Sequence, residues 1–256
     1  MQKPKKSLGQ NFLIDKNISN KIVNSSSNIK KNNVIEIGPG NGALTDFIIS
    51  KKPTKLILIE KDKYLFLNLK NKYKNFKFVK IYNCDALKFN YNKISKPKTI
   101  ISNLPYNVSI KLIVNWIKEI KDYSEIICMI QKEVANKLNY KLQKKNRLNT
   151  LTDLLTNYEI LFNVSNNVFY PKPKIQSSVI KLTYKKNLIK NFDKLEIFTR
   201  ILFQKKRKKI MNVLPKNIIE EIKKSQKLKY DKLINLRAED LNINEIKIIF
   251  KIFSRI

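Results

Sequence analysis

A glycine-rich segment of this sequence reads Glu36-Ile37-Gly38-Pro39-Gly40-Asn41-Gly42. It follows an apolar run at residues 34–37 and precedes a helical pattern that starts near residue 43. Glycine at such a place permits a tight turn and lets a ligand approach the backbone at the start of a helix. The 256 residues include only four glycines, and three of them stand here. We therefore expect a strand, a ligand-binding turn and a helix in that order.

The spacing of these glycines narrows the kind of ligand. It is G-x-G-x-G, whereas the dinucleotide-binding turn has the longer spacing G-x-G-x-x-G. The shorter turn suits a ligand without a pyrophosphate, and it disfavours a nicotinamide-dependent oxidoreductase.

Short β-rich apolar runs alternate with helical patterns around this turn. Their nearly continuous apolar character is typical of parallel strands that are buried on both faces. Helical spacing between them completes β-α-β units. Strands are predicted at residues 34–37, 56–59, 76–79, 99–101 and 126–129, and helices near 43–51, 62–73 and 109–121.

The pattern changes after residue 158. Two β-rich runs, at about 159–169 and 177–184, predict an antiparallel hairpin at a sheet edge, and from about 188 onward only helical periodicity remains. We expect an α/β fold, with a doubly wound, mostly parallel sheet and its edge hairpin in residues 1–185. A small all-α C-terminal domain would occupy residues 186–256.

Two carboxylates follow the second and third predicted strands. Glu60 ends the second strand, and a carboxylate there can accept hydrogen bonds from both hydroxyls of an adenosine ribose. Asp85 follows the third strand, where it can accept a bond from an adenine amine. In this order after G-x-G-x-G, the set resembles the Rossmann-like class I methyltransferases that use S-adenosylmethionine.

The fourth strand is followed by Asn103-Leu104-Pro105-Tyr106, which resembles the motif of methyltransferases that act on the N6 amine of adenine. That amine is a poor nucleophile because its lone pair is delocalised into the ring. The Asn103 side-chain oxygen and the Leu104 carbonyl can accept its two N–H bonds and favour a pyramidal nitrogen. Asn103 cannot act as a general base, so we infer positioning and electrostatics. Tyr106 could stack on the base and face a cationic sulfonium.

The composition excludes several other classes. The chain has no histidine and only two cysteines, Cys84 and Cys128, so it lacks Ser-His-Asp, Cys-His and HExxH machinery, and we expect no metal. The first residues lack the apolar core of a secretory signal, and no apolar run approaches the ~18 residues that span a bilayer. We expect a soluble, cytoplasmic protein.

The chain is strongly basic. It contains 53 Lys and Arg against 20 Asp and Glu, a formal net charge of +33. Such a charge attracts polyanions, which makes RNA the leading partner. Drift in an AT-rich genome, whose codons favour Lys, Asn and Ile, is an alternative source of part of the excess.

Further motifs are similar to those of the KsgA family of small-subunit rRNA adenine N6,N6-dimethyltransferases, over nearly the whole chain. The N-terminal Lys5-Lys6-Ser7-Leu8-Gly9-Gln10-Asn11-Phe12-Leu13 is similar to the opening motif of that family, and Gln131-Lys132-Glu133-Val134-Ala135 follows the fifth strand as it does there. Residues 169–179, from Phe169-Tyr170-Pro171 to Ser177-Ser178-Val179, match F-x-P-x-P-K-V-x-S-x-V. The tail contains a basic segment that begins with Phe203-Gln204 and continues through residues 205–209. It also contains Leu236-Arg237-Ala238-Glu239, and the two segments are similar to two further family signatures.

The resemblance implies roles for individual residues. Asn11 and Leu13 would hold the methionine end of S-adenosylmethionine, and Phe169 would be a second aromatic clamp on a flipped adenine, beside the catalytic set Asn103, Leu104, Pro105 and Tyr106. The remaining cofactor-binding residues would be Gly38, Gly40, Glu60, Asp85, Ala86 and Asn103. Contact with rRNA would fall to Arg147 and to Lys205, Lys206, Arg207, Lys208 and Lys209.

Two positions depart from the family pattern. Asn146 stands where the family usually has Gly or Ser before Arg-Leu, and Gln176 replaces a frequent Asp. Neither belongs to the cofactor motifs.

The resulting expectation is an enzyme that dimethylates two adjacent adenosines of small-subunit rRNA, or of the pre-small ribosomal subunit, and acts as a monomer. Two alternatives remain open. One is a non-catalytic rRNA-binding assembly factor that kept the fold. The other is a member of the related Erm group, which modifies large-subunit rRNA, although the Leu-Arg-Ala-Glu tail favours the KsgA family.

Overall fold

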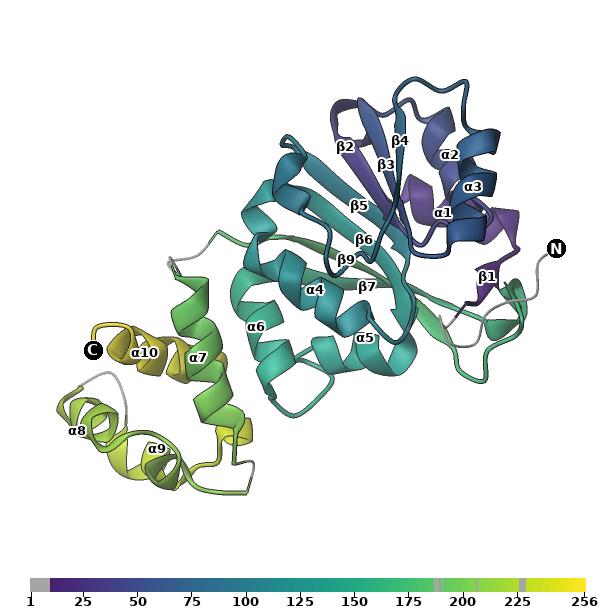
Figure 1. Ribbon diagram of the computed structural model, residues 1–256. Coiled ribbons are helices and arrows are strands. Elements are labelled where there is room, and N and C mark those ends of the chain that lie inside the picture. Colours follow the sequence, from purple (N-terminus) through teal and green to yellow (C-terminus); the bar gives the residue numbers. More distant parts are fainter. Residues whose placement is uncertain (1–9, 187–188, 190, 206, 226–228) are drawn as a thin grey trace. The chain divides into compact units, whose positions relative to one another are not determined.

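The computed structural model describes residues 10–186, 189, 191–205, 207–225 and 229–256. The chain forms two compact units, and each is described by itself (Figure 1). The first unit comprises residues 1–135 and 157–184, and the second comprises residues 136–156 and 185–256. Part of the opening motif, residues 5–9, lies outside the described residues.

The first unit is built on a seven-stranded sheet in the order β4-β3-β2-β5-β6-β9-β7. The pairs β4–β3, β3–β2, β2–β5 and β5–β6 are parallel, whereas β9 runs antiparallel to β6. The predicted α/β fold, with a mostly parallel sheet and antiparallel strands at its edge, is confirmed. The strands are β2 (Asn33–Ile37), β3 (Lys55–Glu60), β4 (Val79–Asn83), β5 (Lys98–Asn103), β6 (Tyr123–Gln131), β7 (Thr156–Val164) and β9 (Ser177–Tyr184).

Burial explains why the central strands are mostly apolar. Every residue of β2 is buried, as are residues 56–60 of β3 and 98–102 of β5. Since β2 to β5 all run in the same direction, their carboxyl ends meet at one edge of the sheet. That edge receives Ile37, Glu60, Asn83 and Asn103, and loops at such an edge are where α/β sheets bind ligands.

The strand predicted at residues 76–79 is wrong in position, because β4 begins only at Val79. Phe76 lies in the turn after α3, where its N–H donates to the Tyr73 carbonyl. Its ring packs edge-on against Tyr73 and Phe78, with centroid separations of 6.3 and 5.9 Å. The aromatic cluster thus explains the apolar run. At the sheet edge β4 is only partly buried, so its own sequence lacks a continuous apolar pattern.

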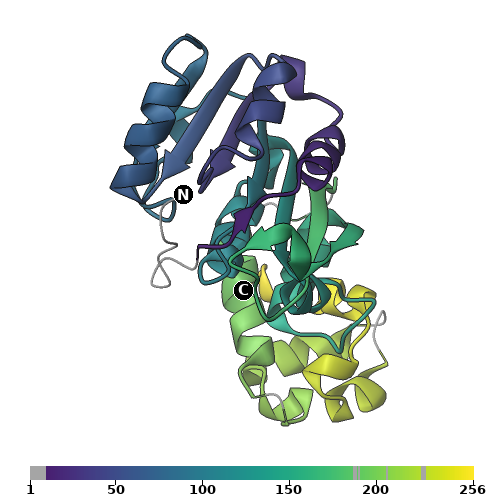
Figure 2. The same ribbon diagram turned by 90° about the vertical axis from the view of Figure 1, so that its right-hand side faces the viewer.

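The helices of the first unit agree only in part with the sequence pattern. Those predicted near 43–51, 62–73 and 109–121 are α2 (Thr45–Ser50), α3 (Lys63–Lys72) and α4 (Ser109–Lys118). Helix α1 (Lys16–Asn24) was not anticipated; it begins at the N-cap Asp15, whose side chain accepts the Ile18 N–H. Figure 1 shows α1, α2 and α3 on one side and α4 apart from them, and the view in Figure 2 faces the side that carries these three helices.

The β-rich run expected at 159–169 forms two separate strands. β7 ends at Val164, and after a 3-10 turn β8 (Phe169–Tyr170) pairs antiparallel with β1 (Phe12–Leu13). This small second sheet joins a segment near the N-terminus to the proline-rich connection, and neither Phe12-Leu13 nor Phe169-Tyr170 is long enough to show a strand period in the sequence.

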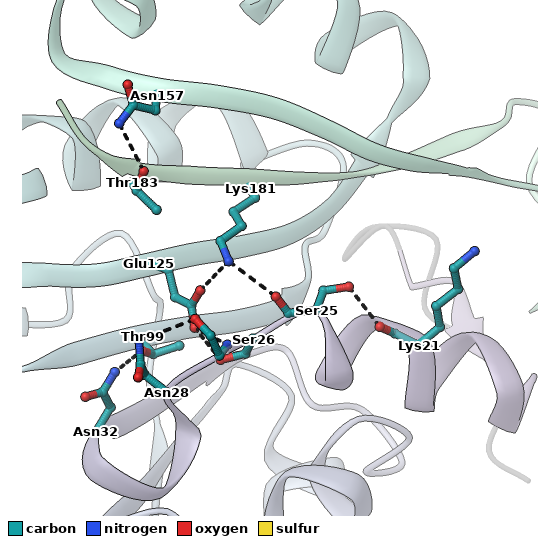
Figure 3. A network of polar contacts seen from close by, with 11 residues as sticks. Lys21, Ser25, Ser26, Asn28, Asn32, Thr99, Glu125, Asn157, Lys181 and Thr183 are labelled. Atoms are coloured by element: carbon teal, nitrogen blue, oxygen red, sulfur yellow. Dashed lines mark hydrogen bonds and ion pairs between the residues drawn. The ribbon is translucent and has the colours of Figure 1, made fainter.

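A buried polar network ties the antiparallel edge to the rest of the sheet (Figure 3). Glu125 of β6, 2% exposed, accepts hydrogen bonds from the Ser26 hydroxyl and the Ser27 N–H and pairs with Lys181 of β9 at 2.7 Å. The Lys181 ammonium also donates to the Ser25 carbonyl after α1. A buried charge with this many partners fixes one arrangement of the elements that supply them, so β9 is held in register against β6.

The second unit is helical. Apart from the start of β7 and an isolated β-bridge between Lys209 and Arg237, the regular elements of its described residues are helices. They include α6 (Arg147–Leu155), α7 (Phe192–Phe203), α8 (Lys216–Lys224), α9 (Tyr230–Asn235) and α10 (Ile243–Phe253), while α5 (Lys132–Leu138) crosses the division between the units.

Residues 136–156 group with these helices, whereas the sequence division at 185 puts them in the first domain. Two ion pairs, Arg147–Glu196 and Lys144–Glu239, hold them there. Asn146, one of the departures from the family pattern, caps α6 by accepting from the Leu148 and Asn149 N–H groups. No helix in the described part of the chain is long and apolar enough to cross a membrane.

The turn after β2 gives a first test of the fold. Gly42 has φ +86°, and a Cβ at this position would lie on the Tyr73 hydroxyl, which itself donates to Asp46 at 2.6 Å. We expect Gly42→Ala to lower the free energy of unfolding by about 1–3 kcal/mol, measured by thermal or urea denaturation. In a Tyr73→Phe background, which lacks the hydroxyl, the same change should cost less. An equal cost in both backgrounds would contradict this account.

Candidate active site

The carboxyl edge of the parallel strands surrounds a cavity in the first unit. The glycine turn forms one wall, and the ends of β3, β4 and β5 supply others. The Gly38 N–H donates to the Ile59 carbonyl at 2.9 Å, which joins the turn to β3. The turn, the two acids and the tetrapeptide, although far apart in the sequence, all line this one cavity.

Glu60 links the turn to the end of β3. Its carboxylate accepts hydrogen bonds from the N–H groups of Gly40 at 3.2 Å and Asp62 at 2.9 Å. It is 5% exposed. Burial raises the pKa of this carboxyl, and the two backbone bonds oppose the rise. Each oxygen has a second lone pair, so Glu60 can still accept bonds from a ligand's hydroxyls.

Asp85 lies in the loop after β4. It accepts a bond from the Leu87 N–H and one from the Lys61 ammonium, each at 2.9 Å. The backbone bond foremost, and the lysine next, lower the pKa of this carboxyl, so it is ionised at neutral pH and can only accept. Ala86 follows it and is buried against the cavity.

The tetrapeptide begins at the last residue of β5. The Leu104 N–H donates to the Met129 carbonyl of β6 at 3.0 Å, and Ser102 donates to the Ile37 carbonyl at 2.7 Å. The Asn103 amide nitrogen donates to the Asn11 carbonyl at 3.3 Å. This bond fixes the orientation of the amide. An amide nitrogen can only donate, so the Asn103 oxygen is the atom that can accept a bond from a substrate.

The segment at residues 10–13 closes another side of the cavity. Asn11 and Leu13 both line it, as predicted for residues near the cofactor. Phe12 lies between them and contacts the turn, since a Cβ on Gly40 would be only 3.0 Å from its ring. The Gln10 side chain donates to Asp62 at 3.3 Å, which connects this segment to the start of α3.

Among the predicted catalytic and cofactor-binding residues, Phe169 is the one that the structure does not bring to the cavity wall. It is 3% exposed and belongs to the hydrophobic core with Leu13, its partner across the β1–β8 pair. Tyr170 beside it is 53% exposed. The clamp role of Phe169 stays a prediction.

The residues predicted to contact rRNA lie in the second unit. Lys205, Arg207, Lys208 and Lys209 are exposed, and Lys206 lies outside the described residues. Lys209 donates to the Asn235 side chain at 2.9 Å. Arg147 pairs with Glu196 and is 41% exposed, so its guanidinium already has an acidic partner within the unit.

The sequence indicated no role for three residues that line the cavity, Gln10, Glu36 and Lys61, or for Asp62, which accepts a hydrogen bond from Gln10. Glu36 is 2% exposed and accepts a bond from Thr45 at 2.7 Å. Burial raises its pKa to about 8. Asp62 had a usable signal, because an Asp before a helical pattern is a typical N-cap. Within the described ranges, no group of three or more Cys, Asp or Glu side chains could hold a metal ion.

The sheet is mostly parallel and has this strand order, and the glycine turn and the acids lie at its carboxyl edge. These features define the class of protein as Rossmann-like methyltransferases. The model of the family described as "Ribosomal RNA adenine dimethylase" matches residues 1–254. The chain belongs to this family.

Relatives agree with that assignment. A ribosomal RNA small subunit methyltransferase A from Malacoplasma penetrans is 42% identical over 84% of this chain and 80% of its own length. The protein of the same name from Pelagibacter ubique is 39% identical over 93% and 92%.

Two solved structures share the fold. A dimethyladenosine transferase from Plasmodium falciparum has a TM-score of 0.80 at 24% identity, covering 95% of this chain and 98% of that one. The 23S rRNA methyltransferase ErmE has a TM-score of 0.73 at 20% identity, covering 95% and 99%.

The buried Glu36 carboxyl predicts how stability depends on pH. Its pKa is about 8 in the folded chain against 4.5 as the ordinary value, so between these pH values the folded state keeps a proton that the unfolded state releases. The free energy of unfolding should therefore fall as the pH rises from 5 to 8 and level off above 8. Glu36→Gln cannot ionise at this position, so it should remove this part of the fall in the free energy of unfolding.

Urea denaturation of both proteins at pH 5, 6, 7 and 8 measures the difference. Glu60, whose pKa is also raised, is present in both proteins, so its contribution to the pH dependence cancels in the difference. Parallel pH profiles for the two proteins would count against a neutral Glu36 in the folded chain.

Proposed function

We propose that this chain uses S-adenosylmethionine to dimethylate N6 of two adjacent adenosines in small-subunit rRNA, as a step in biogenesis of the small ribosomal subunit. The observation that carries the proposal is the position of Asn103, whose amide is fixed by Asn11 at the wall of a cavity that also contains Glu60 and Asp85. The names of the relatives support the choice of small-subunit rRNA.

The donor set of the cavity fits S-adenosylmethionine. Glu60 would accept the ribose hydroxyls, Asp85 would accept the adenine amine beside Ala86, and Asn11, Leu13 and Gly38 would border the methionine end. Gly38 has φ +61°, a conformation that favours glycine, and a Cβ there would lie in ordinary contact with the Pro105 ring at 3.5 Å, so the turn and the tetrapeptide lie close together. S-adenosylmethionine would supply the electrophilic methyl group.

The residues of the tetrapeptide would orient the nucleophile. The Asn103 oxygen and the Leu104 carbonyl would accept the two N–H bonds of the adenine amine, and Pro105 would stiffen the backbone that follows them. With no histidine in the chain, holding the amine in an attacking geometry is a better account than removing its proton first. Tyr106 would stack on the base.

The second methylation places a limit on this arrangement. A monomethylated amine has only one N–H left, so Asn103 and Leu104 cannot both be essential acceptors in both steps. One of the two would bind the remaining N–H, and the new methyl group would turn away from the other.

The contact with rRNA would come mainly from the second unit. We assign residues 1–185 to the chemistry and 186–256 to rRNA, with Lys205 to Lys209 as a principal contact. A basic surface of this kind predicts binding that weakens steeply as salt is raised. The enzyme would act as a monomer in the cytoplasm.

Replacing Asn103 separates the enzyme from a non-catalytic assembly factor. We expect Asn103→Ala to lower the rate of dimethylation of undermethylated small subunits by ~10²-fold or more, as does removal of a group that stabilises a transition state. The Kd for rRNA should stay unchanged. Mass spectrometry of the rRNA nucleosides and filter binding measure the two quantities. If wild type forms no N6,N6-dimethyladenosine, the enzymatic proposal fails. If it modifies large subunits instead, the Erm alternative is correct.

The proposed clamp needs a control for stability, because Phe169 is buried in the core. Phe169→Ala should weaken the interaction with the target base by ~1–3 kcal/mol, seen as a loss of kcat/KM. Val164→Ala, in the same hydrophobic core but away from the cavity wall, controls for loosened packing. If Phe169→Ala loses no more kcat/KM than Val164→Ala at a temperature where both are folded, Phe169 is only a core residue.

A further inference from the structure

Ser177 is the first residue of β9, and its hydroxyl lies 2.8 Å from the Tyr106 hydroxyl. Ser177 is fully buried. The two residues are 71 positions apart in the sequence, and the family motif that contains Ser177 gives no reason for a hydroxyl there. The contact therefore joins the antiparallel edge of the sheet to the tetrapeptide at the cavity.

The backbone of the tetrapeptide is already fixed without Ser177. The Leu104 N–H donates to Met129, the Val108 N–H donates to Pro105, and the Ser109 hydroxyl donates to the Tyr106 carbonyl. These bonds leave the two side-chain torsions of Tyr106 free. A hydrogen bond at the far end of the ring restricts both torsions at once.

Tyr106 also needs a polar partner at its hydroxyl. The side chain is partly buried, and this burial raises the pKa of the phenol, whereas the bond with Ser177 lowers it. The hydroxyl is therefore protonated at neutral pH. A half-buried phenol without a partner would be destabilised, so Ser177 favours the one ring orientation in which the two hydroxyls meet.

The strand that carries Ser177 is itself held firmly. Ser177 pairs with Gln131 at the end of β6, and four residues further along β9 Lys181 is bonded to the buried Glu125 (Figure 3). Side chains two or four positions apart in a strand lie on the same face. Both residues on this face are thus anchored, which makes β9 a rigid support for the Tyr106 hydroxyl.

We propose that Ser177 is a positioning residue that holds the Tyr106 ring in the orientation needed to stack on the target adenine. The inference rests on the proposed function, because it requires Tyr106 to contact that base. Without Ser177 the ring would sample other rotamers, and fewer bound adenines would be aligned for methyl transfer.

The neighbouring Ser178 supplies a matched control. It is also fully buried, and its hydroxyl donates to the Asn163 side chain at 2.7 Å, on the opposite face of β9. Ser177→Ala and Ser178→Ala therefore each remove one buried hydroxyl and one hydrogen bond from the same strand. A purely structural role would affect the two variants alike.

The test compares Ser177→Ala, Tyr106→Phe, the double variant and Ser178→Ala. We expect Ser177→Ala and Tyr106→Phe each to lower kcat by about 3–10-fold, the size expected for one hydrogen bond, with KM for the RNA substrate nearly unchanged. The kcat of the double variant should be no lower than that of the less active single variant, because both changes break the same contact. Ser178→Ala should keep wild-type kcat. The Kd for S-adenosylhomocysteine, measured by calorimetry, should be the same in all four.

Two results would overturn the inference while the wild type remains active. The first is that Ser177→Ala and Ser178→Ala have equal kcat. The second is that the fold-loss of kcat in the double variant equals the product of the fold-losses in Ser177→Ala and Tyr106→Phe. Absence of methylation by the wild type on every ribosomal substrate would instead refute the proposed function on which the inference rests.

Discussion

The Gly40 N–H donates to the Glu60 carboxylate, and this one bond joins the glycine turn to the end of β3. It requires φ +58° at Gly40, which residues with a side chain rarely adopt. It also requires the parallel register that puts Ile37 opposite Ile59, because only then does the turn begin level with Glu60. The buried strands keep that register, and the turn then places Gly38, Glu60 and the start of α2 around one cavity. The rest of the site is built against this fixed wall.

The electrostatics of the cavity differ from those of the chain as a whole. The net charge is +33, yet the cavity is lined by Glu36, Glu60 and Asp85, with Lys61 paired to Asp85. The ionised Asp85 disfavours a phosphate and, with Glu60, offers acceptors to hydroxyls and amines, whereas Glu36 is neutral at pH 7. The basic residues act elsewhere, because attraction of a polyanion is a long-range effect of the surface. The proposed attraction of RNA to the surface is therefore compatible with a cavity suited to a nucleoside without a phosphate.

The sequence was sufficient wherever a functional residue follows a buried parallel strand. Glu60 and Asn103 end such strands, so a strand prediction also predicts that they meet, whereas Asp85 follows β4, which is only partly buried and begins later than its predicted strand. The sequence does not determine a position that depends on which way a side chain turns or on a partner far along the chain. Phe169 lies in a two-residue strand whose face is decided by pairing with β1, and Glu36 is recognisable as a neutral carboxyl only once its burial is known. Residues 136–156 group with the second unit through Glu196 and Glu239, which no local pattern indicates.

The antiparallel direction of β9 gives the site a component that parallel strands cannot provide. Parallel strands contribute only their carboxyl ends to the functional edge, and the loops that follow them. Because β9 runs the other way, its first residue reaches that same edge, opposite the last residue of β6. The proline-rich connection that begins at Phe169-Tyr170 therefore ends beside the tetrapeptide. The side of the cavity proposed to hold the cofactor is made by β2, β3 and β4, and the side proposed to hold the base is made by β5 together with the start of β9. An edge hairpin, which in the sequence looks like an addition to the sheet, thus completes the half of the site on which recognition of the target base would depend.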